Sequence, residues 1–555
     1  MRGTEVLWCT TIAYVMFVFS CTSTTAVVAV ADSSSSGNIK KTMCGRRFVV
    51  DDTAMVDSTE GALSQARGFM GVAMVDDPAV VVFAGGIGQE GTTVVESSVD
   101  AFWGVISDPS DSSAENTVER EVLSLRIPRT DMGAGSTTRA LFFAGGCGID
   151  VEPEPPAAPD ADLVGDVGQG LDTPTDPKDV AVGDEGLRDA TVAEADPAGA
   201  DTDASPLSVR YCKPTDVVDV FAPAEGSGDD GVSLITTDGV RLCEPKYAAS
   251  AGVFFAGDGD DGDPSSWSPT AYIMVAGGIV QTGEGQYTAT DTVDILREDG
   301  IDPDTGKVIV TNLQVQRLPN PPRFEMTSSC FKHQCVFAGG RVSMGDGDAD
   351  FYSDRVDVWD GSTWSFDSWG EHILSEPRNK MGSAVVEITI DGTKTTVGLF
   401  VGGVSNAGNS PTVDLFSYDD ERMLPRMSAP TISGPTHGVS LSRSVAAFVS
   451  ETGKIDVFDG ETLCWTSYEA EGFSTGTSAV GRSPAWFFNA TSPGFRETGG
   501  VDGDGVSVQE SSAFVGGGVA GASGGDVSRE VHELRWRSTK GREAGGAEDD
   551  VEACL

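Results

Sequence analysis

The segment that decides the fold is SDRVDVWDGSTWSF, residues 353–366. In it Val356 and Val358 alternate with Asp357, and this two-residue period is typical of a β-strand whose two faces meet different environments. The Asp-Gly pair that follows indicates a tight turn. We therefore interpret the segment as a strand and the turn that leaves it.

The Val-Asp motif of this strand recurs along the chain. Seven copies begin at Val99, Val218, Val293, Val356, Val413, Ile455 and Val531. Six of them follow an apolar run that ends in paired glycines, and these are Gly85, Gly86, Gly145, Gly146, Gly277, Gly278, Gly339, Gly340, Gly402, Gly403, Gly516 and Gly517. The sixth unit has VAAFVS instead, ending at Ser450. With a strand before the glycines and one after Val-Asp, each unit predicts four short strands.

The recurring glycines and aromatic residues have a packing explanation. Glycine at the end of an inner strand allows positive φ and a close approach of neighbouring backbone. Aromatic residues after Val-Asp, such as Trp359, are expected to fill the space between neighbouring sheets, together with the tryptophans that follow, which are Trp364, Trp465 and Trp536. Because one four-stranded sheet cannot bury both faces alone, stacking of the units in a ring is expected.

A basic residue marks the entry to the first strand of several units. These residues are Arg67, Arg129, Arg323, Arg378 and Arg482, with Lys246 in the third unit, and the first four each have Met three residues later. In the sixth unit we place His437 at that Met position. One interpretation is a basic ring that faces a ligand at one end of the fold. We favour the other, in which these side chains cap loop carbonyls and pair with the surplus aspartates.

The combination of Gly-Gly, a later aromatic and Trp, and a Pro-Arg entry resembles kelch repeats across roughly residues 60 to 540. The resemblance implies an all-β kelch-type β-propeller of seven four-stranded blades, with six as the alternative count. The missing doublet of the sixth unit and Met where the family often has His depart from the family pattern. The last unit lacks an outer strand, and we expect RRFVV, residues 46–50, to supply it and close the last blade.

Segments of other composition surround or interrupt the repeat. We expect a signal peptide at 1–31, a flexible segment at 32–43, the propeller at 44–540 and a disordered acidic tail at 541–555. Residues 151–205 carry 15 acidic residues against two basic ones, which predicts a disordered insert in a loop of the second blade. We interpret the insert as a tolerated loop expansion; an acidic arm for a basic partner is the alternative.

The signal peptide and the charge constrain the compartment and the partners. The formal net charge of −48 disfavours binding to nucleic acid or to anionic membrane surfaces. No second apolar run is long enough to span a bilayer, so we expect a secreted protein. Secretion permits disulfides, for which the candidate pairs are Cys330–Cys335, Cys212–Cys243 and Cys44–Cys554, and it makes Asn489 a glycosylation candidate.

The sequence contains no recognisable catalytic motif. A copper enzyme similar to galactose oxidase is an alternative, but the four histidines, His333, His372, His437 and His532, are spread over different units. A sugar-acting propeller that resembles sialic acid mutarotase is a second alternative, in which the strand-entry arginines would act. We expect no cofactor; acidic loops such as GDGDAD favour ordinary turns over loosely bound calcium. We conclude that a monomeric interaction module, binding a protein or a glycan through its loops, is the best interpretation.

Overall fold

The structure, a computed structural model, describes residues 41–43, 46–50, 62–76, 79–88, 95–103, 119–148, 212–225, 232–257, 270–342, 351–367, 372–390, 392–428, 432–450, 454–469, 478–481, 500–501, 507–516 and 531–539. Some of the expectations above concern residues outside these ranges, namely the signal peptide, the acidic insert at 151–205, the tail at 541–555, Cys44, Cys554, Arg482, Asn489 and Gly517. None of the described residues is helical, so the described fold is all-β.

The first three units each form an antiparallel sheet in chain order. The first contains β4 (Gly71–Asp76), β5 (Ala79–Ala84), β7 (Ser98–Trp103) and β8 (Glu119–Ser124). The second contains β10 (Gly133–Ser136), β11 (Leu141–Ala144), β13 (Lys213–Glu225) and β14 (Val232–Thr237), with β15 (Arg241–Lys246) also on β13. The third contains β16 (Ser250–Ala256), β17 (Thr270–Ala276), β20 (Thr292–Ile301) and β21 (Val308–Arg317).

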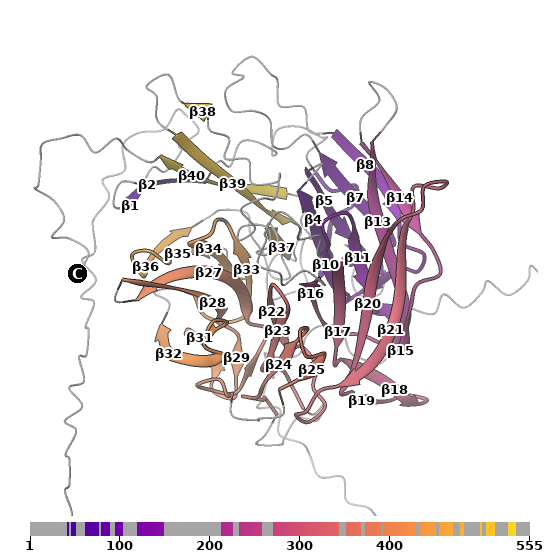
Figure 1. The fold of residues 1–555 in the computed structure, drawn as a ribbon. Coiled ribbons are helices and arrows are strands. Elements are labelled where there is room, and N and C mark those ends of the chain that lie inside the picture. The colour runs from indigo at the N-terminus through magenta and orange to yellow at the C-terminus, as the bar shows by residue number, and fades with distance from the viewer. Residues whose placement is uncertain are drawn as a thin grey trace, which may run out of the picture. The chain divides into compact units, whose positions relative to one another are not determined.

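The next three sheets repeat this order (Figure 1). The fourth contains β22 (Thr327–Phe331), β23 (Gln334–Ala338), β24 (Val356–Asp360) and β25 (Ser365–Phe366). The fifth contains β27 (Gly382–Ile390), β28 (Thr393–Val401), β31 (Thr412–Ser417) and β32 (Arg422–Ser428). The sixth contains β33 (Thr436–Ser440), β34 (Val445–Ser450), β35 (Lys454–Asp459) and β36 (Cys464–Glu469). The Val-Asp segment of residues 356–360 is thus the third strand of its sheet, β24.

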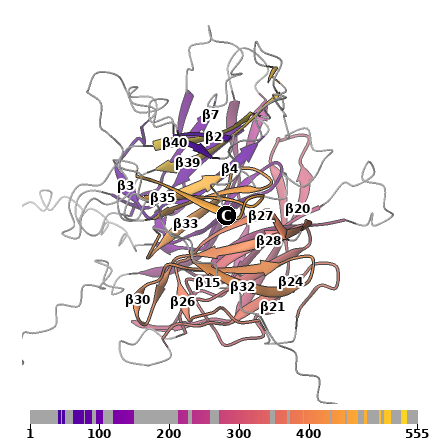
Figure 2. The ribbon, with the colours of Figure 1, turned by 90° about the vertical axis from the view of Figure 1, so that its left-hand side faces the viewer.

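The last sheet combines strands from both ends of the chain. It contains β37 (Ser478–Gly481), β39 (Ser507–Gly516) and β40 (Val531–Thr539), with β38 (Gly500–Val501) on β39. Strand β2 (Arg46–Val50) pairs antiparallel with β40, which is the pairing predicted for RRFVV, and both views show β2 beside β39 and β40 (Figures 1 and 2). Strand β1 (Lys41–Met43) adds to β2, so the segment we expected to be flexible up to residue 43 ends in a strand.

The first strands of successive sheets contact one another. Strand β4 contacts β10, and the contacts continue through β16, β22, β27, β33 and β37, which in turn contacts β4. This order of contacts is compatible with a β-propeller.

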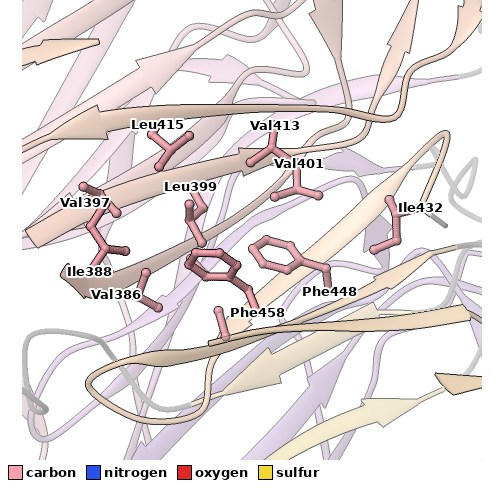
Figure 3. Close-up of a cluster of buried hydrophobic side chains, with 12 residues drawn as sticks. Val386, Ile388, Val397, Leu399, Val401, Val413, Leu415, Ile432, Phe448 and Phe458 are labelled. Carbon is pink, nitrogen blue, oxygen red and sulfur yellow. The ribbon is translucent and has the colours of Figure 1, made fainter. Parts of the chain in front are cut away.

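Apolar side chains fill the space between neighbouring sheets. Between the fifth and sixth sheets, Leu399 and Val386 pack with Phe448 and Phe458 (Figure 3), and Trp465 lies 4.9 Å from Phe458 between ring centroids. Fully burying one such phenylalanine contributes about 1.5–3 kcal/mol. In the fourth sheet Trp359 is fully buried, and the ring centroid of Trp364 lies 5.0 Å from that of Tyr272 in the third sheet. Phe254, Met274 and Phe337 belong to the same buried cluster between these two sheets.

The glycine doublets bring neighbouring sheets into close backbone contact. In the fifth sheet Gly402 and Gly403 have φ of +71° and +95°, in the left-handed region that favours glycine. A Cβ atom on Gly402 would lie 2.9 Å from the carbonyl oxygen of Gly434 at the entry of the sixth sheet, and one on Gly403 would lie 2.4 Å from the carbonyl oxygen of Asn379 at the entry of its own sheet. Only glycine fits this position without moving the backbone.

Two disulfides are present among the described cysteines. The predicted bond between Cys330 and Cys335 is confirmed and joins β22 to β23. The predicted pairing of Cys212 with Cys243 is wrong: Cys212 is bonded to Cys147, whose Cα atom is 5.2 Å away, and Cys243 is free and exposed on β15. The register explains the correction, because β12 (Cys147–Gly148) pairs with the first residues of β13, directly beside Cys212. Two disulfides fit an oxidising compartment.

Within the part of the chain that the structure describes, no helix has the length and apolar character needed to cross a membrane.

Candidate functional site

The basic residues at the strand entries form buried ion pairs with the aspartates of the Val-Asp motifs. In the first five sheets the pairs are Arg67–Asp100 (2.7 Å), Arg129–Asp219 (2.7 Å), Lys246–Asp294 (2.8 Å), Arg323–Asp357 and Arg378–Asp414 (2.7 Å). The basic side chains are 0% exposed and the aspartates at most 4% exposed. Each pair joins the entry of a sheet to its own third strand.

The guanidinium groups also donate to backbone carbonyls. Arg67 Nη2 lies 3.0 Å from the Phe83 oxygen, and Arg378 Nη2 lies 3.1 Å from the Phe400 oxygen. Burial lowers the pKa of Arg378, and Asp414 opposes that effect. These contacts of Arg67, Arg129, Arg323 and Arg378 fit the favoured interpretation, pairing with aspartates and hydrogen bonding to carbonyls, and not a ligand-facing ring, because the side chains are buried.

The residue two positions after each basic residue has a left-handed backbone. These five residues, which we call the entry belt, are Phe69 (φ 56°), Asp131 (51°), Ala248 (51°), Glu325 (53°) and Lys380 (52°). The conformation is unusual for residues other than glycine and costs of order 1–3 kcal/mol. The entry belt thus repeats one strained backbone geometry with five different side chains.

Hydrogen bonds connect the entry belt from sheet to sheet. The Ala248 amide donates to the Asp131 carbonyl at 3.1 Å, and the Glu325 amide donates to the Ala248 carbonyl at 2.9 Å. The Thr436 amide of the sixth sheet donates to the Lys380 carbonyl at 3.1 Å. The belt positions of successive sheets are therefore neighbours in space.

The loops between second and third strands begin beside the entry belt. Strand β9 (Arg129–Thr130) pairs with β12, β3 (Arg67–Gly68) pairs with β6 (Ile87–Gly88), and β26 (Arg378–Asn379) pairs with β29 (Val404–Ser405). Strand β29 continues into β30 (Gly408–Asn409), and the third sheet has a hairpin of β18 (Ile279–Gly283) and β19 (Gln286–Ala289). We call the surface formed by the belt and these loops the entry face. Cys147 and Cys212, which flank the acidic insert in the sequence, are bonded to each other beside β12 and β13.

Polar groups gather at one part of the entry belt. Glu325 lies 3.7 Å from the Lys380 ammonium and 3.8 Å from the Arg341 guanidinium, and it accepts a hydrogen bond from Asn379 Nδ2. Three buried atoms here have no hydrogen-bond partner among the described residues, namely the Tyr247 hydroxyl oxygen, Asn379 Oδ1 and Arg341 Nε, and the Asp131 side chain beside them is exposed. This part of the belt therefore has unused hydrogen-bonding capacity.

The same neighbourhood raises the pKa values of two side chains, Asp131 and Tyr247. The surrounding protein raises the pKa of Asp131 to about 6 by limiting its hydration; Glu325 adds to the shift and Lys380 opposes it. Burial, together with Asp131 and Glu325, raises the pKa of the Tyr247 hydroxyl. Tyr247 therefore stays neutral at physiological pH and can donate one hydrogen bond.

The described histidines do not converge. His333 lies 3.7 Å from Asp360 near the β22–β23 turn, and His372 lies 3.7 Å from Asp367 before β26. His437 pairs with Val449, which pairs with Ile455 of the Val-Asp motif; this is the register of Gly382 in β27, one residue after Met381, so its assignment to the Met position is wrong. His532 lies in β40. No group of three or more His, Cys, Asp or Glu side chains is placed to hold a metal ion in the described ranges.

Sequence reasoning did not match individual arginines with individual aspartates. A signal was available, because units one to five each contain both a strand-entry base and a Val-Asp motif, whereas no Lys or Arg occurs in residues 427–442 at the entry of the sixth. The entry belt was missed altogether, because its residues share a backbone conformation and no side-chain type. No protein-family model matches the chain, and no curated protein sequence matches it significantly.

Proposed function

We propose that the chain is a secreted, seven-bladed β-propeller of the kelch type that binds a protein partner through its entry face. Seven sheets whose first strands contact one another in order, with β37 contacting β4, support the blade count. The pairing of β2 with β40 supports closure of the last blade by the N-terminal strand. The two disulfides support export.

The observation that carries the proposal is the entry belt. A rigid scaffold that repeats one backbone position while its side chain changes from Phe69 to Asp131 to Lys380 presents a varied surface on a constant backbone geometry. Strained residues cluster at functional sites more often than elsewhere. The second-to-third-strand loops begin at the same face and add contact area.

The sugar-acting alternative depended on the strand-entry arginines. Four of the five, Arg67, Arg129, Arg323 and Arg378, are fully buried and paired with aspartate. Their placement favours a structural role, and the interaction function is the better supported of the two.

The chain offers a matched pair of variants for the test. The turns at the far ends of β22 and β31 contain two further left-handed residues, Lys332 (φ 53°) and Glu421 (φ 51°), both exposed. The double variant Glu325→Gln/Lys380→Met changes the entry face, and Glu421→Gln/Lys332→Met makes the same chemical changes away from it. Both double variants leave the net charge unchanged.

The test uses purified residues 32–555 to capture partners from the fluid into which the protein is exported, followed by affinity measurement with the recovered partner. We expect the entry-face variant to bind at least tenfold more weakly and the control variant to bind as the native chain does. Equal binding by both variants would contradict the proposal, as would the recovery of a glycan as the main ligand.

A further inference from the structure

Two polar groups beside the entry belt have no partner among the described residues although they are almost completely buried, and exposed Asp131 lies beside them. Asn379 is 2% exposed and Tyr247 is 7% exposed, and Asn379 Oδ1 and the Tyr247 hydroxyl each lack a hydrogen bond. A buried polar group without a partner costs about 1–3 kcal/mol. Native proteins seldom keep two such groups close together unless something binds them.

The orientation of these groups is fixed by their neighbours. Asn379 Nδ2 donates to Glu325, which leaves Oδ1 as the free acceptor of the amide. The Tyr247 ring packs edge-to-face on Tyr287 at 6.4 Å between centroids and belongs to the buried cluster around the Cys147–Cys212 disulfide. Rigidly held groups bind a ligand without an entropic cost of ordering.

The three groups belong to one cluster. The Ala248 amide, directly after Tyr247, donates to the Asp131 carbonyl, and the Glu325 amide donates to Ala248 in turn. Asp131, Glu325 and Tyr247 are close enough to perturb one another electrostatically. Asn379 joins the cluster through Glu325.

The unused capacity is mainly that of acceptors. The Asp131 carboxylate and Asn379 Oδ1 accept only, and the Tyr247 oxygen accepts as well as donates. Both cations of the cluster, Lys380 and Arg341, already lie near Glu325, and the unpaired donor among the buried atoms is Arg341 Nε. A ligand with several N–H donors and a positive charge satisfies these groups best, and the net charge of −48 favours its approach.

We propose that Asp131, Tyr247 and Asn379 form a binding site for one cationic side chain, a lysine ammonium or an arginine guanidinium, of the protein partner. This inference rests on the proposed function and names the chemistry of the group that the entry face recognises. The ammonium or guanidinium donates to the Asp131 carboxylate, to Asn379 Oδ1 and to the Tyr247 oxygen.

The test uses a small probe, the blocked tripeptide acetyl-Gly-Lys-Gly-amide, titrated calorimetrically into residues 32–555 at physiological salt. The same tripeptide with Gln in place of Lys, and galactose, are the comparison ligands. We expect saturable binding of the lysine probe alone. Saturable binding of galactose in its place would overturn the proposal in favour of a polyhydroxylated ligand.

The net negative charge of the protein attracts any cation. The variants must therefore distinguish binding at this site from non-specific electrostatic attraction. Tyr247→Phe removes a hydroxyl and no charge, and we expect at least fivefold weaker binding with no loss of thermal stability, because that hydroxyl has no partner to lose. Asp131→Asn is expected to weaken binding at least tenfold. The control Glu421→Gln removes one negative charge elsewhere and should change binding less than twofold. Equal losses for Asp131→Asn and Glu421→Gln, or no effect of Tyr247→Phe, would overturn the site.

The failure of this inference differs from the failure of the proposed function. A captured partner that requires Glu325 and Lys380, combined with no binding of the lysine probe, contradicts the cation site and leaves the proposed function standing. In the opposite case, the lysine probe binds saturably and Tyr247→Phe weakens that binding, but the entry-face variant captures the partner as well as the native chain does. This result contradicts the proposed function and supports the cation site.

Discussion

The fifth and sixth sheets have the same strand order but differ in the entry residues near the buried aspartate of the third strand. In the fifth, buried Asp414 pairs with Arg378 and also accepts from the Ser375 amide at 3.2 Å. In the sixth, buried Asp456 occupies the equivalent position and accepts from the Ile432 amide at 3.0 Å, at an entry that contains no basic residue.

The difference shows which part of the ion pair the fold requires. An acceptor in the third strand ties the incoming segment to the sheet in both cases, because a buried backbone N–H needs a partner. The arginine adds a second connection, from the entry to the carbonyl of Phe400 in the second strand. The aspartate and its backbone donor are common to both sheets, whereas Arg378 has no basic counterpart within residues 427–442 at the entry of the sixth.

The largest expected effect separates these two aspartates. Asp414→Asn leaves the buried Arg378 without its counter-charge and should lower the free energy of unfolding by about 3–5 kcal/mol. Asp456→Asn keeps an acceptor oxygen for the Ile432 amide and should cost about 1–2 kcal/mol. Urea denaturation of both variants measures the difference.

A companion variant distinguishes an uncompensated charge from lost packing. Replacing both partners, as in Arg378→Met/Asp414→Leu, should cost less than Asp414→Asn alone, because no buried charge remains. Similar losses for Asp414→Asn and Asp456→Asn would show that the two sheets do not differ in the way described.

The second sheet differs from the fifth and sixth by its insert, which the Cys147–Cys212 disulfide closes at its base with a sequence separation of 65. By the chain-entropy relation, Cys147→Ala/Cys212→Ala should cost about 4 kcal/mol in the full chain. Replacing residues 151–209 by a few glycines and serines should leave the fold intact and reduce that cost to about 2.7 kcal/mol. An unchanged cost in the shortened chain, measured by denaturant unfolding, would contradict the entropic explanation.

A smaller effect concerns the glycine doublet of the fifth sheet, which the sixth does not repeat. Gly392 has φ of +78°, and no other atom lies within 4 Å of the position that a Cβ atom would take there. Gly392→Ala therefore tests backbone strain alone and should cost about 1 kcal/mol. Gly403→Ala adds a clash with the Asn379 carbonyl and should cost about 2 kcal/mol more. Equal losses in thermal unfolding would argue against the close approach.

The smallest effect is a pH dependence specific to the sixth sheet. Burial lowers the pKa of His437 from 6.5 to about 4, so the unfolded chain takes up a proton first as the pH falls. Stability from this group is present above about pH 6.5 and decreases as the pH falls toward about 4. His437→Ser, which replaces the imidazole by a small polar side chain that does not titrate in this range, should reduce the fall in Tm between pH 7 and pH 4.5. An identical fall in Tm in both proteins would show that His437 does not cause this pH dependence.

Local patterns predicted much of the strand content. The two-residue alternation around Val356 predicted β24, and the apolar runs before the doublets predicted the second strands, because side-chain period and glycine conformation are properties of short segments. The pairing of RRFVV with the C-terminal unit followed from counting strands in an incomplete unit.

Pairings between distant residues were harder to predict. The bond between Cys147 and Cys212 depends on the register of β12 against β13 across the insert, which spacing along the chain does not contain. The position of His437 likewise depended on the pairing of β33 with β34, where a shift of one residue changes which residues are equivalent.

The sequence alone determined the all-β class, the strand period and the presence of a strand-entry base and a Val-Asp motif in each of the first five units. These follow from local conformational preference and from repetition. Only the tertiary structure decided that base and aspartate form one buried pair, and that Asp131, Tyr247 and Asn379 come together with unused acceptors. Those contacts join residues of different sheets or strands, and their free energy depends on burial, which the folded chain alone creates.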